Sequence, residues 1–65
     1  MSELTETPNL PDPDGFYAEL LQLHEGLSEE ESHKLNARLI LILCNHIGKR
    51  DVLTAAFDLA AKRVG

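Results

Sequence analysis

The single cysteine, Cys44, most constrains how this chain of 65 residues can fold. One cysteine cannot form an internal disulfide, and no Cys/His spacing resembles a structural zinc site. A chain of this length buries only about 60% of the surface that its unfolded form exposes. Its stability must therefore come from apolar packing, and a core of this size is marginal unless something else stabilises it.

The composition is that of one folded domain preceded by a short arm. Hydrophobic residues make up 43% of the chain and charged residues 26%, which is normal for a globular protein. Residues 1–11 are rich in polar residues and proline, so we expect a flexible N-terminal arm there and a single domain over residues 12–65. The arm has no features of a signal peptide, which predicts a cytoplasmic protein. The longest apolar run, residues 39–44, is far shorter than the roughly 20 residues of a membrane span.

Local signals predict an all-α fold with three helices. We expect the helices over about residues 13–25, 29–47 and 52–64. Short connections between them favour a small antiparallel three-helix bundle. The predicted N-caps are Asp12, Ser28 and Asp51, and glycines are expected to end the first two helices. Ser28 followed three residues later by Glu31 is the pattern of a capping box, the clearest of these signals.

The apolar faces of these helices are wide for a chain of this size. On the helix over 13–25, one stripe consists of Phe16, Leu20, Leu23 and His24, which Leu27 extends. On the helix over 29–47, the stripe of Leu35, Leu39, Ile42, Leu43 and His46 is widened past half the circumference by Ala37, Ile40, Cys44 and Ile47. On the helix over 52–64, the stripe is Leu53, Ala56, Phe57, Ala60 and Val64. A helix that is apolar over half its circumference must contact elements on two sides.

This excess of apolar surface predicts contact with another protein, either a second copy or a larger subunit. The remaining polar strip of the middle helix is narrow, and Leu41 interrupts it. The candidate interface residues are Tyr17, Leu41, Val52 and Leu59, with Asn36, Arg38, Asn45 and His46 supplying polar specificity.

Charge is divided between the two halves of the chain. Residues 1–33 contain nine acidic residues and no Lys or Arg, a net charge of −9. Residues 34–65 contain all six basic residues and two acidic ones, a net charge of +4, so that the whole chain carries −5. Helix dipoles favour acidic residues at helix starts and basic residues at helix ends, which is one explanation. A bipolar surface that orients a partner is the other.

The sequence does not predict an enzyme, a cofactor, a metal site or a small-molecule substrate. Cys44 and His46 are two positions apart, so on a helix they point about 200° from each other and cannot form a nucleophile–base pair. The histidines lack the i, i+4 spacing of a helical metal pair, and no glycine-rich phosphate loop is present. A metal or thiol enzyme is the weakest alternative.

A helix-turn-helix regulator of DNA is the stronger alternative, because three short helices with a glycine-containing turn fit the size of such a module. The charge of the chain opposes it. The sequence pI of about 4.9 is far from the basic character of DNA-binding domains. We therefore expect no binding to nucleic acid.

Several short motifs resemble a family of small uncharacterised bacterial proteins, domain of unknown function 2783. The motifs that carry the resemblance are Asp-Pro-Asp at 12–14, Phe-Tyr at 16–17, His-Glu-Gly-Leu-Ser at 24–28, Leu-Asn-Ala-Arg-Leu-Ile-Leu at 35–41 and Asn-His-Ile-Gly at 45–48. The resemblance implies a short bacterial protein of unassigned role. It also implies, through members encoded near flavin-dependent oxygenases, an accessory subunit of a larger enzyme.

Overall fold

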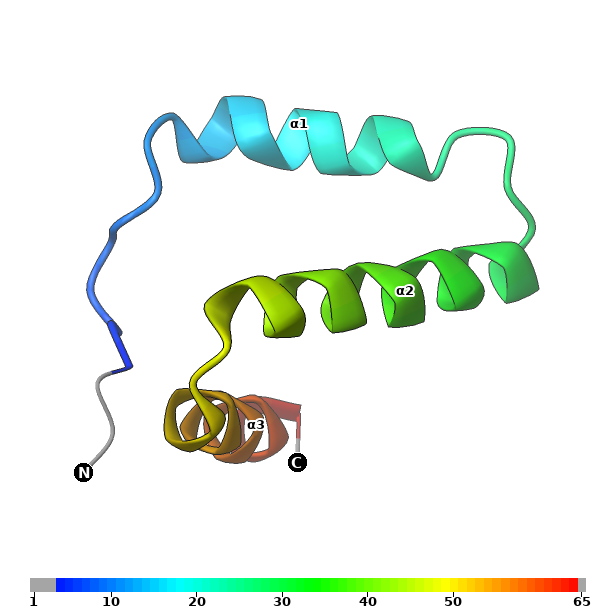
Figure 1. The fold of residues 1–65 in the computed structure, drawn as a ribbon. Helices are drawn as coiled ribbons and strands as arrows, with labels where there is room; N and C mark the ends of the chain where they lie inside the picture. Colours follow the sequence, from blue (N-terminus) through cyan, green and yellow to red (C-terminus); the bar gives the residue numbers. More distant parts are fainter. Residues whose placement is uncertain (1–3, 65) are drawn as a thin grey trace.

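The computed structural model describes residues 4–64, and these form three α-helices without a β-strand (Figure 1). The helices are α1 (Pro13–Leu23), α2 (Glu29–Ile47) and α3 (Arg50–Val64). The predicted all-α fold is confirmed. Met1, Ser2 and Glu3, which belong to the predicted arm, lie outside the described residues.

Helix α1 begins at an unusual N-cap. Asp12 has a left-handed backbone, with φ of 48°, and its carboxylate accepts a hydrogen bond from the Gly15 N–H at 3.3 Å. A Cβ at position 15 would overlap that carboxylate, so any other residue there would displace the Asp12 side chain from this position. The helix ends at Leu23, two residues before the expected end. The N–H groups of His24 and Glu25 bond to carbonyls three residues back, at 3.0 and 3.2 Å, which tightens the chain into a turn.

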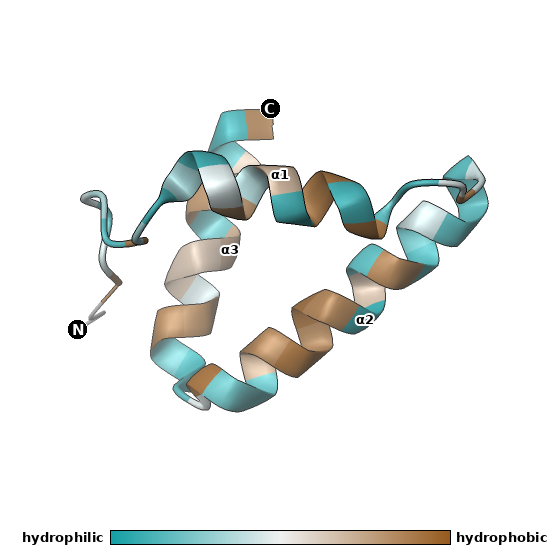
Figure 2. Ribbon diagram, turned by 90° about the horizontal axis from the view of Figure 1, so that it is seen from above, coloured by the Kyte–Doolittle hydropathy of each residue, from teal (hydrophilic) through white to brown (hydrophobic). Residues whose placement is uncertain are grey.

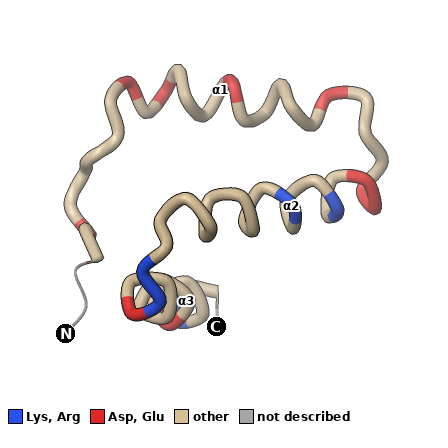
Figure 3. Tube along the Cα trace, viewed as in Figure 1, with Lys and Arg blue, Asp and Glu red and all other residues tan. Residues whose placement is uncertain are grey.

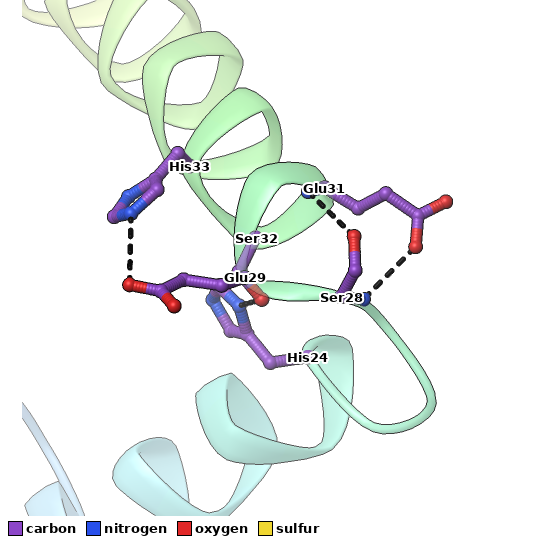
Figure 4. Close-up of polar contacts among 6 residues, drawn as sticks. All are labelled: His24, Ser28, Glu29, Glu31, Ser32 and His33. Carbon is purple, nitrogen blue, oxygen red and sulfur yellow. Dashed lines mark hydrogen bonds and ion pairs between the residues drawn. The ribbon is translucent and has the colours of Figure 1, made fainter.

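Helix α2 begins at the predicted capping box (Figure 4). The Ser28 hydroxyl accepts from the Glu31 N–H at 3.1 Å, and the Glu31 carboxylate accepts from the Ser28 N–H at 2.9 Å. The bond from the Ser28 N–H, with a smaller contribution from the Ser28 side chain, lowers the pKa of Glu31 below its ordinary value of 4.5, because donors near the carboxylate stabilise its ionised form. The helix ends at Gly48, which has φ of 69°. Both predicted ends of α2 are confirmed.

Helix α3 begins two residues earlier than expected. The carbonyl of Lys49 already accepts the N–H of Leu53, at 3.0 Å, so the first helical turn includes Arg50 and Asp51. The prediction of Asp51 as the N-cap is therefore wrong. Its carboxylate lies in the first turn, where it still interacts favourably with the helix dipole.

The predicted antiparallel bundle packing is not confirmed. Helices α1 and α2 run in opposite directions, whereas α3 is seen end-on in Figure 1 and crosses them, so that the three enclose a triangle when seen from above (Figure 2). Among residues 4–64 no two helices pack extensively against each other. The radius of gyration is 13.5 Å, compared with about 11 Å for a compact domain of this length. The chain therefore folds locally without closing around a core of its own.

Replacing Ser28 with alanine tests the contribution of the capping box. We expect the free energy of unfolding to fall by about 1 kcal/mol, because the N–H of Glu31 loses its acceptor. Ser28→Asp is the matched control, since aspartate also caps helices well and stability should be largely kept. Urea denaturation followed by circular dichroism measures both. Equal loss in the two variants would contradict this role of the cap.

The lowered pKa of Glu31 predicts a pH dependence. A carboxylate whose pKa is lower in the folded state adds stability above its unfolded pKa, and that stability is lost as the pH falls through the folded value. The chain should therefore lose stability below about pH 4.5, and Glu31→Gln should lose less over the same range. Thermal melts from pH 7 to pH 3 provide the comparison, with Glu30→Gln as control. An identical pH profile for wild type and Glu31→Gln would refute the prediction.

Candidate protein-interaction surface

Uncovered apolar side chains dominate the surface. None of the residues whose burial is described is buried, and even the best-covered side chains are only half-buried. Twelve large hydrophobic residues are exposed among those of described burial. They are Leu10, Phe16, Tyr17, Leu21, Leu23, Ile40, Leu41, Ile42, Leu43, Ile47, Phe57 and Val64. Figure 2 shows that hydrophobic residues are concentrated on the second half of α2.

The exposed area measures how incomplete the packing is. The chain exposes 5966 Å². A compact monomer of the same mass, 7.2 kDa, exposes about 4,100 Å². The difference, about 1,800 Å², is polar and apolar area that a compact fold of the same mass would cover.

One side of α2 faces the end of α1. The half-buried residues Ser32, Leu35 and Leu39 share this side. It is joined to α1 by a hydrogen bond of 2.9 Å between His24 Nδ1 and Ser32 Oγ (Figure 4). Leu20 and Leu27 are also half-buried and belong, like His24, to the stripe predicted for α1. The stripe predicted for α1 is therefore covered in part, while Phe16 and Leu23 of the same stripe stay exposed.

A second side of α2 is uncovered along its whole length. We call Asn36, Ile40, Leu43 and Ile47 the α2 seam. Its three apolar members are 53%, 50% and 47% exposed, and Asn36 is exposed as well. The spacing of 4, 3 and 4 residues keeps these side chains in one narrow row, as in the contact row of a coiled coil.

The third side of α2 is the polar strip. Arg38, Asn45 and the 70% exposed Leu41 lie on it. His46, by contrast, lies on the predicted apolar stripe and is exposed. The candidate residues of α2 are therefore spread over three sides of the helix, and the structure does not bring them together as one site. The candidate on α1, Tyr17, is exposed.

Helix α3 is covered only in part on the face expected. Leu53 and Ala56 of the predicted core stripe are half-buried, as are Val52 and Leu59, the two candidates here. Phe57 and Val64, which belong to the same stripe, are 57% and 90% exposed. Leu4 and Glu6 of the N-terminal segment line a hollow together with Leu59 and its neighbours on α3. Sequence reasoning missed Phe57 and Val64 as surface residues because an apolar stripe does not show which element covers it.

Polar side chains meet at the start of α2, in an exposed ion pair and in a shallow hollow. Within residues 4–64, no three His, Cys, Asp or Glu residues are grouped closely enough to hold a metal ion. His33 approaches Glu29 at 3.8 Å, but both side chains are largely exposed to water. A shallow hollow of about 350 Å³ at the start of α2 is lined by Leu27, Glu31, Lys34, Leu35 and Arg38. In the part of the chain that the structure describes, no helix has the length and apolar character that crossing a membrane requires.

The His24–Ser32 hydrogen bond predicts a difference between two neighbouring substitutions. Ser32→Ala should lower the free energy of unfolding by about 1 kcal/mol, because a part-buried bond between α1 and α2 is lost. His33→Ala removes only an exposed ion pair and should change stability by less than about 0.5 kcal/mol. Urea denaturation of both variants is the measurement. A His33 effect equal to the Ser32 effect would contradict the assignment.

A family model covers nearly the whole chain, including all of α1 and α2. The match extends over residues 4–62 of the 65 residues, and the family is described as Protein of unknown function (DUF2783). Nothing matched among curated proteins, and nothing matched among solved structures. The resemblance noted from the short motifs is thereby confirmed, and the chain belongs to the DUF2783 family.

Proposed function

We propose that this protein is a non-catalytic, helical protein-interaction module whose fold is completed by a second polypeptide. The observation that supports the proposal is that no residue of described burial is buried in a chain that is 43% hydrophobic. Exposing so many large apolar side chains to water is unfavourable, and isolated helices of 11 to 19 residues are marginal without tertiary packing. Contact with another chain would cover the apolar side chains and would also stabilise the helices.

The proposed interface combines the uncovered apolar groups with polar ones at their borders. Tyr17 and Leu41 supply exposed apolar area on α1 and α2. Asn36, Arg38, Asn45 and His46 are the exposed polar groups of α2 that would select the partner. Val52 and Leu59 are half-buried and would contribute through their remaining exposed area. Such an arrangement, an apolar centre with a polar rim, is typical of protein interfaces.

Two classes of partner are compatible with this role in principle. One is a second copy of the chain, and the other is a larger enzyme subunit, such as the flavin-dependent oxygenase that the resemblance suggests. DNA is disfavoured by the net charge of −5 of the chain, and Asp51 and Asp58 on α3, the proposed reading helix, would repel phosphates. The proposal places the protein in the cytoplasm.

The proposal predicts that the chain is not a stable monomer. At low micromolar concentration, light scattering should give a mass above the 7.2 kDa of one chain, or the chain alone should be largely unfolded. If it associates, its Tm should rise with protein concentration, because association stabilises the folded state by mass action.

A matched control is the same chain with random duplex DNA at low salt, which should leave mass and Tm unchanged. A folded monomer with a cooperative melt that does not depend on concentration would overturn the proposal.

A further inference from the structure

We infer that the second polypeptide is another copy of this chain, and that two copies pair through antiparallel contact of their α2 seams. This inference rests on the proposed function and specifies its partner. The seam, defined above as Asn36, Ile40, Leu43 and Ile47, is exposed at all four positions. It spans 12 residues of α2, about 18 Å.

The seam is self-complementary when a second α2 lies against it in the opposite direction. In a two-fold arrangement centred between Leu41 and Ile42, Ile40 of one copy faces Leu43 of the other, and Asn36 faces Ile47. A two-fold interface requires this reciprocity, because every contact occurs twice. The spacing of 4, 3 and 4 residues allows the two rows to interlock as knobs and holes.

The charged residues at the two ends of α2 favour antiparallel pairing of the two helices. Glu29, Glu30 and Glu31 occupy the first turn of α2. The basic residues Lys49 and Arg50 follow directly after its other end (Figure 3). A parallel pair would place six glutamates of two copies side by side, which is unfavourable. An antiparallel pair instead brings the acidic start of each α2 near the basic end of the other.

Asn36 supports the same register. The antiparallel pairing places its amide at the end of the partner's α2, where the last helical carbonyls lack intrahelical donors. One polar residue in an otherwise apolar contact row restricts the register and the number of chains, at a cost in stability. A shift of the two helices by one turn would instead set Asn36 against apolar side chains only.

The uncovered area is of the size that an obligate dimer needs. The excess exposed surface is about 1,800 Å² per chain. Permanent dimers bury about 2,000 to 5,000 Å² in total, or about 1,000 to 2,500 Å² per chain. A second copy brings the same excess, so the two surfaces match in extent. Residues on α1 and α3, such as Phe57, are available to pack around the central α2 pair.

A distance measurement on the full chain tests the pairing without disturbing the seam. The only cysteine is changed by Cys44→Ala, and Glu30→Cys then carries a nitroxide label in the first turn of α2. Double electron–electron resonance should show a separation of about 35 Å between labels, since position 30 lies 11.5 residues from the two-fold centre. A parallel pair would place the labels near the interaxial distance of about 10 Å.

Two substitutions form the matched pair for the second measurement. Ile40→Asp introduces a charge into the seam and should weaken dimerisation on the order of 100-fold or more by light scattering. Ala18→Asp introduces the same charge at an exposed position of α1, away from the seam, and should leave the dimer intact. If Ile40→Asp also unfolds the chain, the label distance in the chain with Ile40 intact still decides the question.

The outcomes separate this inference from the function on which it rests. A dimer with the 35 Å distance and sensitivity at Ile40 supports the inference. A dimer with a short distance, or one broken by Ala18→Asp but not by Ile40→Asp, overturns the seam while the interaction module stands. A chain that remains unpaired alone and folds only on addition of a different purified protein also overturns the inference and supports the proposed function. A folded, stable monomer overturns both.

Discussion

The reciprocal hydrogen bonds between Ser28 and Glu31 are the interaction on which the rest of the arrangement depends. They determine where α2 begins and stabilise its first turn. Because residues repeat every 3.6 positions, side chains three and four residues apart then share one side of this longest helix. The side toward α1, the α2 seam and the polar strip all follow from this repeat. The left-handed Gly48 then ends α2 and redirects the chain.

The helices could be predicted from sequence because their signals are local. A capping box needs only two residues three positions apart, and a C-terminal glycine acts through its own backbone. Prediction failed where two signals competed at one junction. Asp51 is a good cap by residue type, yet the chain after Gly48 is already helical at Arg50. Propensity does not reveal how soon a backbone resumes helical geometry after a turn.

The arrangement of the helices could not be predicted in the same way. An apolar stripe shows that a side chain needs cover, but not which element provides it. On α3, Leu59 is half-buried next to a segment that includes Leu4, while Phe57 is exposed. The antiparallel bundle assumed that every stripe is covered within one chain, and the described helices do not meet in that way. For the candidate residues, the residue type and the helix side could be predicted from the sequence. Their separation over three sides of α2 became clear only from the structure.

The division of charge can now be analysed position by position. Helix dipoles account for Asp14 and for the glutamates that begin α2, because these lie in first turns. They also account for Lys62 and Arg63 in the last turn of α3.

Dipoles do not account for Arg50, which lies in the first turn of α3, where positive charge is unfavourable. Nor do they account for Arg38 near the middle of α2. A bipolar surface explains Arg50 better: in the proposed antiparallel dimer, Arg50 follows the end of α2 at the place to which the second copy brings the glutamates that begin its own α2. On that proposal, the charge pattern would serve association as well as the individual helices.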